Sequence, residues 1–326
     1  MQIQPKYLFI CLIFFLGLLT IDAEIRRQGD RLLNSPYWDY QVLNNLKEPS
    51  VADIFVIGGC RAALQIDPKI IQATTHLKTY NAGRVVEGLG NTDFTLNVIL
   101  SKQTPKYMVI VLDDGSWEET LDTARDEVKK KLAWKALISP SRQDTLRARY
   151  GLYSPLLYSG LLRYSGMGED LIYSAVRERR QKILAPRPDA YDPRSDSQDI
   201  RSLINSNLEG ILRDIRKDFK PTNFSQYLLN IWIADLEKQG VQPIIVIPPM
   251  HKYRATNHVN DAIIDLATKI SEKNKTPNLI YLNNSSDFAN NNLFWSDQGH
   301  MNKRGAEAFS KILGADLEKI IRSAKK

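Results

Sequence analysis

The chain has 326 residues, of which 43% are hydrophobic and 25% charged, and its formal net charge is +7. This composition is that of an ordinary globular protein with one large domain or two small ones. The basic residues are dispersed, which excludes the basic patch typical of proteins that bind nucleic acid, so no nucleic-acid partner is expected.

The N-terminal segment contains an apolar run from residue 7 to 21. At about 15 residues it fits the apolar core of a signal peptide better than a full membrane span, which needs about 20. Residues 21–23 read Ile-Asp-Ala, a poor cleavage site because Ile is large, so an uncleaved signal anchor is one alternative and a buried core helix another. A signal peptide or anchor over 1–23 predicts that residues 24–326 lie outside the cytoplasm, periplasmic or secreted.

The two cysteines are Cys11, inside the apolar run, and Cys60, beyond it. No disulfide is therefore expected within the domain. Cys60 is a lone thiol in an oxidising compartment, either reactive or a small buried core residue.

From residue 53 onward, short apolar runs alternate with helical patterns, which predicts an α/β domain. Continuous Ile and Val runs are typical of a parallel sheet buried on both faces. We therefore predict a three-layer α/β/α sandwich with a five-stranded parallel sheet and right-handed crossovers. The expected strands lie at 53–57, 78–80, 107–112, 243–247 and 278–282, and the expected helices at 61–75, 223–239, 260–273 and 303–324.

The interval 115–222 is too long for an ordinary crossover between two strands. It contains helical stretches divided by a Pro-rich break at 185–193. We interpret it as a helical insertion that caps one end of the sheet, the alternative being a helical layer with no role at the site.

Polar residues follow the expected strands at their carboxyl ends, where ligands bind in open parallel sheets. Because these ends share one edge of the sheet, the residues are expected to lie close together. They are Cys60 and Arg61 after the first strand, Gly83 after the second, Asp114 after the third, His251 after the fourth, and Asp297 and His300 after the fifth.

Asp297 and His300 stand three residues apart, just before the last helix. At this spacing the carboxylate can fix the tautomer of the imidazole, and the ring can act as a general base. The nucleophile is expected at Cys60, near a helix start, where the helix dipole and a neighbouring histidine favour the thiolate. The backbone N–H groups of Cys60 and Gly83 would form an oxyanion hole.

The remaining site residues have two interpretations each. Arg61 either packs over the strand ends or pairs with an anionic substrate, and Asp114 either caps a helix or binds a substrate hydroxyl. His251 is expected at the rim, as a substrate contact or a plain surface group. No metal and no cofactor are expected, since neither a metal-ligand cluster nor a Gly-rich phosphate loop is visible.

These motifs resemble the SGNH/GDSL hydrolase superfamily, especially its extracytoplasmic, membrane-anchored branch, which moves acyl groups on and off cell-envelope polymers. The resemblance covers residues 53 to 324, leaves the interval 115–222 unmatched, and implies the flavodoxin-like SGNH fold. Its blocks are a strand ending in Gly-x-Ser, matched by Gly58-Gly59-Cys60, a Gly after strand two, matched by Gly83, and Asp-x-x-His, matched by Asp297 to His300.

Two positions depart from the family pattern. Cys60 stands where the family has its nucleophilic serine. The third block normally contains an Asn that donates to the oxyanion, but here it reads Leu112-Asp113-Asp114-Gly115. An ionised carboxylate cannot donate, and the loss of one donor lowers the rate by about 10²–10³.

Two functions therefore compete. In the first, an esterase or O-acyltransferase acts on an envelope glycan, polymer or other acyl ester, with Cys60 as nucleophile, His300 as general base and Asp297 orienting the ring. In the second, a catalytically degenerate SGNH-like protein binds glycan or assists a membrane-bound O-acyltransferase. The first requires an accessible Cys60 within hydrogen-bond reach of His300.

Overall fold

The computed structural model describes residues 5–33, 52–85, 88–113, 117–131, 138–152, 220–252, 254, 257–282 and 286–324. Five strands form one sheet in the order β2-β1-β3-β4-β5, and every neighbouring pair is parallel. This is the flavodoxin-like order, with its topological switch between β1 and β3. The predicted five-stranded parallel sheet is confirmed. The strands are β1 (Ile54–Ile57), β2 (Thr79–Asn81), β3 (Tyr107–Val111), β4 (Gln242–Ile247) and β5 (Asn278–Ile280).

Side chains of the strands alternate between two hydrophobic cores, one on each face of the sheet. In β1, Phe55 and Ile57 belong to one core, and Ile54 and Val56 belong to the other. The same alternation runs through β3 and β4, as expected where successive side chains point to opposite faces. Burial on both faces explains the uninterrupted Ile and Val runs.

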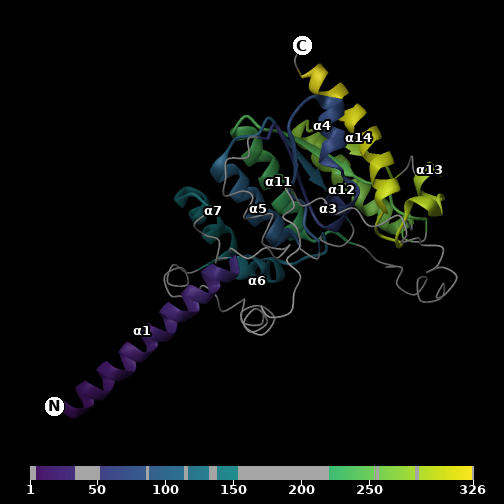
Figure 1. Cartoon of the computed structure of the whole chain (residues 1–326). Helices are drawn as coiled ribbons and strands as arrows, with labels where there is room; N and C mark the ends of the chain where they lie inside the picture. Colours follow the sequence, from purple (N-terminus) through teal and green to yellow (C-terminus); the bar gives the residue numbers. More distant parts are fainter. Residues whose placement is uncertain are drawn as a thin grey trace.

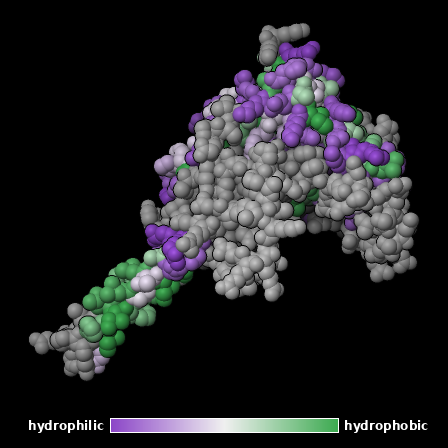
Figure 2. Space-filling view, in the orientation of Figure 1, coloured by the Kyte–Doolittle hydropathy of each residue, from purple (hydrophilic) through white to green (hydrophobic). Residues whose placement is uncertain are grey.

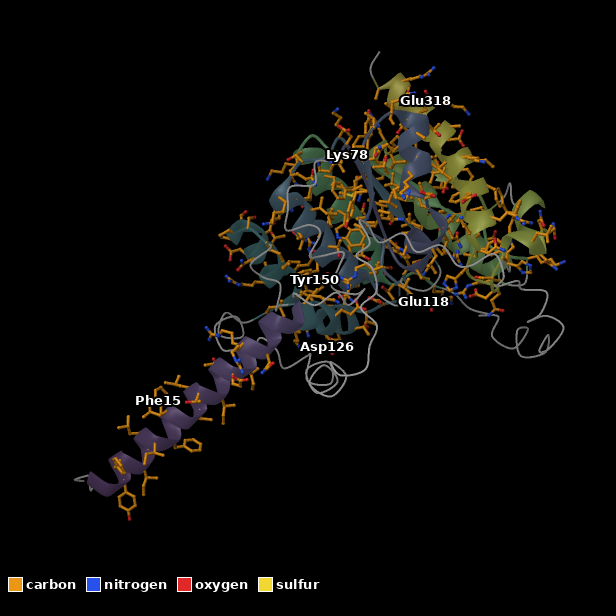
Figure 3. All side chains as sticks on the ribbon, in the orientation of Figure 1. Phe15, Lys78, Glu118, Asp126, Tyr150 and Glu318 are labelled. Carbon is orange, nitrogen blue, oxygen red and sulfur yellow. The ribbon has the colours of Figure 1, made fainter. Side chains whose placement is uncertain are left out.

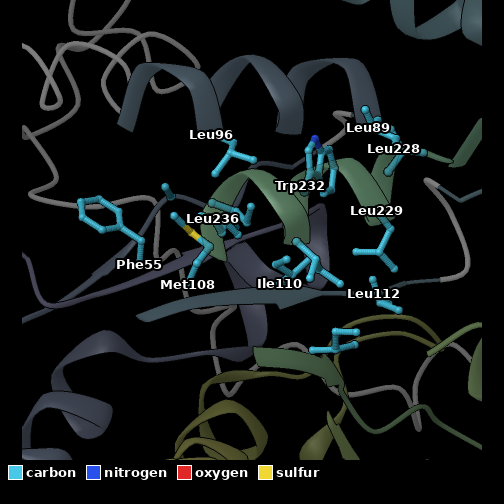
Figure 4. Packing of buried hydrophobic residues seen from close by; sticks show 14 of the residues in the cluster. Phe55, Leu89, Leu96, Met108, Ile110, Leu112, Leu228, Leu229, Trp232 and Leu236 are labelled. Atoms are coloured by element: carbon cyan, nitrogen blue, oxygen red, sulfur yellow. The ribbon is translucent and has the colours of Figure 1, made fainter. Parts of the chain in front are cut away.

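Helices cover both faces and complete the three layers (Figure 1). Figure 4 shows side chains of two helices, Leu96 and Trp232 among them, facing Met108 and Ile110 of β3. The helices of that face are α5 (Leu89–Lys102), α11 (Asn223–Lys238) and α12 (Asn257–Asn274), and those of the other face are α3 (Cys60–Gln65), α4 (Pro68–Thr75) and α14 (Lys303–Ser323).

The helix predicted at 61–75 is two helices, α3 and α4. Pro68 is the first residue of α4, and the Asp67 side chain accepts a hydrogen bond from the Lys69 N–H at 2.9 Å. Proline lacks an N–H group and is disfavoured inside a helix, yet it suits the first helical position. The chain therefore ends one helix and starts another at this point.

Helix α5 has no counterpart among the predicted helices. All its residues from Leu89 to Leu100 are buried, polar ones included. A helix that is covered on every side shows no amphipathic stripe, so its sequence gives no periodic signal.

The predicted insertion at 115–222 falls partly within the described residues. There it forms α6 (Leu121–Lys131) and α7 (Pro140–Tyr150), which pack against α5 and against each other. Residues 114–116, 132–137 and 153–219 lie outside the described part of the chain.

The carboxylate of Asp93 in α5 joins that helix to α7 and α11 in a buried polar network. It accepts hydrogen bonds from the guanidinium of Arg149, from Tyr150 Oη at 2.9 Å and from Trp232 Nε1 at 2.7 Å. Asp93 and Tyr150 are fully buried. Burial, and then the negative charge of Asp93, raise the pKa of Tyr150 well above its usual value.

Helix α1 (Pro5–Leu33) extends away from the sandwich (Figure 1). Its apolar side chains are exposed: Phe9, Phe14 and Phe15 are 63%, 68% and 58% accessible. Figure 2 shows a hydrophobic band along this helix, and Figure 3 shows Phe15 projecting from it. The apolar run is therefore not a buried core helix. Among the described residues, no helix is both long and apolar enough to cross a membrane.

Candidate active site

Cys60 lies at the sharp turn from β1 into α3. Gly58 has φ +144°, and a Cβ atom there would lie 2.9 Å from the Val111 carbonyl oxygen. Only glycine suits both the backbone conformation and this close approach. The turn brings Cys60, the first residue of α3, to the carboxyl edge of the sheet, where it is partly exposed.

Asp297 and His300 lie in a tight loop that we call the histidine turn, residues 295–301. An antiparallel bridge between Trp295 and Met301 closes it. Asp297 Oδ1 accepts hydrogen bonds from the N–H groups of Gly299 at 2.8 Å and His300 at 2.9 Å. The backbone of the turn therefore orients the Asp297 carboxylate independently of its contact with the imidazole of His300.

The histidine turn is anchored between two helical elements, η4 (Asn292–Phe294) and α14; the short α13 (Ser286–Ala289) precedes them. Asn302 caps α14 by accepting the Gly305 N–H at 3.0 Å, and its Nδ2 donates to the Leu293 carbonyl at 2.8 Å. A Cβ atom at Gly305 would lie 2.2 Å from the Phe294 carbonyl oxygen. Glycine at this position lets the backbone before the turn lie directly over the first turn of α14.

His300 joins Asp297 to Cys60. Its Nδ1 lies 2.9 Å from each carboxylate oxygen of Asp297, and its Nε2 lies 3.0 Å from Cys60 Sγ. With Nδ1 donating to the carboxylate, Nε2 is left to accept the thiol proton. The side chains of His300 and Asp297 are 21% and 28% exposed, so a substrate can reach this group. The structure thus brings together the three residues on which the predicted chemistry depends.

Gly83, the predicted second oxyanion donor, has a different role. Its N–H donates to Asn81 Oδ1 at 2.9 Å, while Asn81 Nδ2 donates to the carbonyls of Ala62 and Ile66 at 2.7 and 2.8 Å. A Cβ atom at Gly83 would lie 2.5 Å from Ala62 Cβ. The predicted donation by Gly83 is therefore corrected: its N–H is already used, and the glycine lets the loop after β2 pack directly onto the helix that carries Cys60.

The other predicted donor is the N–H of Cys60, which opens α3. The N–H groups at a helix N-terminus have no acceptor within the helix and favour negative charge. That half of the oxyanion hole stays a prediction.

His251 does not lie at the rim as predicted. It is fully buried, its Nε2 lies 3.0 Å from Asn292 Oδ1, and its ring packs edge-on against Trp295 with 5.6 Å between the ring centroids. Burial lowers the pKa of His251. This histidine therefore supports the histidine turn from the protein interior and is not a surface contact for substrate.

Arg61 is 1% exposed within α3. Its burial supports the packing interpretation over a direct contact with an anionic substrate. Asp114, the last predicted substrate contact, lies outside the described residues.

Two further side chains hold the site and were not identified from the sequence. Asn81 ties β2 to α3 as described above. Gln65, the last residue of α3, is fully buried, and its Nε2 donates to the Gly299 carbonyl at 3.1 Å. A polar amide inside the apolar segment Ala62 to Ile66 is the sequence signal that points to Gln65.

Among the described residues, no three His, Cys, Asp or Glu side chains gather closely enough to hold a metal ion. Comparison with protein-family models gives no match for the chain, and comparison with curated proteins gives none either.

Proposed function

We propose that the chain is an acyl-transfer enzyme of the SGNH/GDSL type, an ester hydrolase or an O-acyltransferase, that works through Cys60, His300 and Asp297. The observation that carries the proposal is the continuous line of contacts from the Asp297 carboxylate through both ring nitrogens of His300 to Cys60 Sγ. A fold alone supports many functions. A nucleophile, a base and an orienting carboxylate within mutual hydrogen-bond reach are the arrangement that nucleophilic catalysis requires.

The first half of the reaction forms a thioester. Cys60 Sγ attacks the acyl carbonyl carbon while its proton passes to His300 Nε2, and the carbonyl oxygen becomes an oxyanion. When this intermediate collapses, the bond to the alcohol oxygen breaks and His300 returns the proton to the departing alkoxide. Asp297 stabilises the imidazolium between these two transfers.

The second half of the reaction releases the acyl group. Water, or the hydroxyl of an acceptor, attacks the thioester carbonyl carbon as His300 Nε2 removes its proton. The C–S bond then breaks, and the proton passes from His300 to Cys60 Sγ. Water yields a carboxylic acid, and an acceptor hydroxyl yields a new ester. Because a thioester is activated toward attack by an alcohol, cysteine at this position is compatible with transfer as well as hydrolysis.

The proposed substrate is an acyl ester on a glycan or other envelope polymer, outside the cytoplasm. The apolar run at 7–21 supports this location. The exposed apolar side chains of α1 support association with a membrane.

One observation favours the second candidate, a degenerate SGNH-like protein that binds glycan or assists a membrane-bound O-acyltransferase. The N–H of Gly83 is used by Asn81, which removes one oxyanion donor. A loss of that kind lowers the rate by about 10²–10³. A binding protein has no need of that donor.

The test measures alkylation of Cys60 against pH in the full chain, in a Cys11→Ser background so that only Cys60 reacts. We expect a thiol that titrates well below about 8.5, with this shift lost in His300→Ala. Incubation with a p-nitrophenyl ester should then leave an acyl group on Cys60 that hydroxylamine removes, seen by mass spectrometry.

If His300→Ala leaves the alkylation profile of Cys60 unchanged and Cys60 takes up no acyl group, the enzymatic proposal is contradicted and the binding protein is favoured. Cys60→Ala is the matched control for acylation, because it removes the nucleophile and leaves Asp297 and His300 in place.

A further inference from the structure

We infer that Gln65 is a positioning residue that sets the distance between the Cys60 thiol and the His300 imidazole. The inference rests on the proposed function, because it concerns the geometry of the same site. Gln65 and Cys60 are the two ends of one short helix, α3. Gln65 Nε2 reaches across to the histidine turn and donates to the Gly299 carbonyl at 3.1 Å.

The peptide group between Gly299 and His300 is held at both of its polar ends. Its carbonyl oxygen accepts from Gln65, and its N–H donates to Asp297 Oδ1 at 2.9 Å. One end is thus fixed to the helix that carries the thiol, and the other to the carboxylate that orients the ring. Together these two bonds place the backbone of His300 relative to Cys60.

The bond from Nε2 to Sγ depends closely on this placement. Its length is 3.0 Å, and hydrogen bonds weaken steeply once the partners separate or lose alignment. A shift of the turn by about 1 Å would remove the thiol from reach of the base, and displacements of that size are known to lower catalytic rates about 10²-fold.

The amide of Gln65 is not explained by packing alone. The side chain is fully buried, and its Oε1 has no hydrogen-bond partner among the described residues. An apolar side chain of similar size would fill the space without leaving a buried acceptor unsatisfied. The contact that distinguishes glutamine from such a side chain is the one with Gly299.

A second contact at the same helix end provides a matched control. Ser310 of α14 is also fully buried; its Oγ accepts the Asp67 N–H at 2.8 Å and donates to the backbone carbonyl of Gln65 at 3.4 Å. These bonds hold the junction of α3 and α4, and they make no contact with the histidine turn. Ser310→Ala therefore removes buried hydrogen bonds nearby and leaves the Gly299–His300 peptide untouched.

The experiment measures the pH profile of Cys60 alkylation in the full chain with Cys11→Ser. Gln65→Met keeps the length of the side chain and removes the donor, and Gln65→Leu replaces it if the methionine variant does not fold. We expect Gln65→Met to move the midpoint of the profile at least halfway toward that of His300→Ala. Ser310→Ala should leave the midpoint unchanged, although both variants lower the melting temperature.

A wild-type midpoint retained in the folded Gln65 variant overturns the inference and leaves the proposed function intact. A midpoint that moves by the same amount in Ser310→Ala also overturns it, because the effect is then one of general packing. If the alkylation midpoint of Cys60 is the same in the wild type and in His300→Ala, both the Cys60–His300 pair and its positioning by Gln65 are overturned. If the midpoint moves as expected but no acyl group is taken up by Cys60, the inference stands and only the proposed function fails.

Discussion

Two carboxylates, Asp297 and Asp93, each organise a polar network in this molecule, but only one network ends in a reactive group. Asp297 holds one nitrogen of His300, and the other nitrogen faces the partly exposed thiol of Cys60. Asp93 of α5 accepts hydrogen bonds from donors on two other helices, α7 and α11, and none of these donor side chains is an accessible nucleophile. The carboxylate of Asp297 orients a histidine beside an accessible thiol, whereas the carboxylate of Asp93 holds α5, α7 and α11 together.

Because only the Asp297 network contains a reactive group, we expect substitutions in the two networks to affect different properties of the protein. A change at Asp297 should alter chemistry at Cys60 more than stability, because its carboxylate is partly exposed and the backbone of the turn remains. A change at Asp93 should alter stability and leave the thiol as it is.

The largest effect is expected from Asp297→Asn, which should slow acylation of Cys60 by about 10⁴-fold, or about 5.4 kcal/mol in activation free energy. The amide can still accept the N–H groups of Gly299 and His300, so the turn keeps its shape. Its NH₂ group, however, favours the tautomer in which Nε2 carries the proton and cannot accept one. The measurement is the second-order rate of p-nitrophenyl ester cleavage, with the denaturation midpoint as the control. Wild-type rates in this variant would show that Asp297 has no part in the chemistry.

The next effect is expected from Asp93→Ala, which should lower the free energy of unfolding by about 3–5 kcal/mol, because it leaves the Arg149 guanidinium buried and uncompensated. The urea midpoint of the full chain measures it. The pH profile of Cys60 alkylation should match that of the wild type wherever the variant is folded. A shifted thiol profile in the folded variant would mean that the two networks are coupled, against the separation argued above.

The contrast also explains which parts of the site are predictable from sequence. Cys60, Asp297 and His300 each follow a recognisable strand or precede a recognisable helix, so the carboxyl edge of a parallel sheet brings them together. Asp297 and His300 are only three residues apart, so a single turn brings their side chains into contact. These are features that pattern and topology determine.

What was missed depends on contacts between distant segments. The donor at Gly83 was assigned by its place after β2, but the side chain of Asn81 takes that donor while it also binds α3. His251 follows β4 in a Pro-rich loop, and it is buried where Trp295 and Asn292, more than 40 residues away in the sequence, contact its ring. Helix α5, with Asp93 inside it, is covered on all sides and carries no stripe. The bond from Gly83 to Asn81 is local, but the bonds that fix the Asn81 side chain on α3, the burial of His251 and the cover of α5 all come from tertiary packing, which no short pattern records.

A second pair of carboxylates, Glu119 and Glu127, differs from both Asp297 and Asp93. Glu119 Oε2 accepts the Leu89 N–H at 2.8 Å, and Glu127 Oε1 accepts the Gly88 N–H at 3.0 Å, so both lie at the N-terminus of α5. Burial, and then the charge of Glu127, raise the pKa of Glu119 to about 7. These acids resemble Asp93 in holding a helix, and Glu119 differs from Asp93 in having a pKa raised into the neutral range.

The smallest effect is therefore expected from Glu119→Gln. A carboxyl group whose pKa is raised on folding contributes stability that is fully present below its unfolded pKa and is lost as pH rises through the folded value, here between about 4.5 and about 7. Glutamine mimics the protonated form, so the variant should equal the wild type near pH 4 and exceed it near pH 8 by on the order of 1 kcal/mol after solvent screening. Urea midpoints across that range measure the difference, and Glu237→Gln on the exposed face of α11 controls for loss of one charge. If the difference in unfolding free energy between the variant and the wild type is the same at every pH, the effect of Glu119 comes from packing, as for Asp93, and not from titration of its carboxyl group.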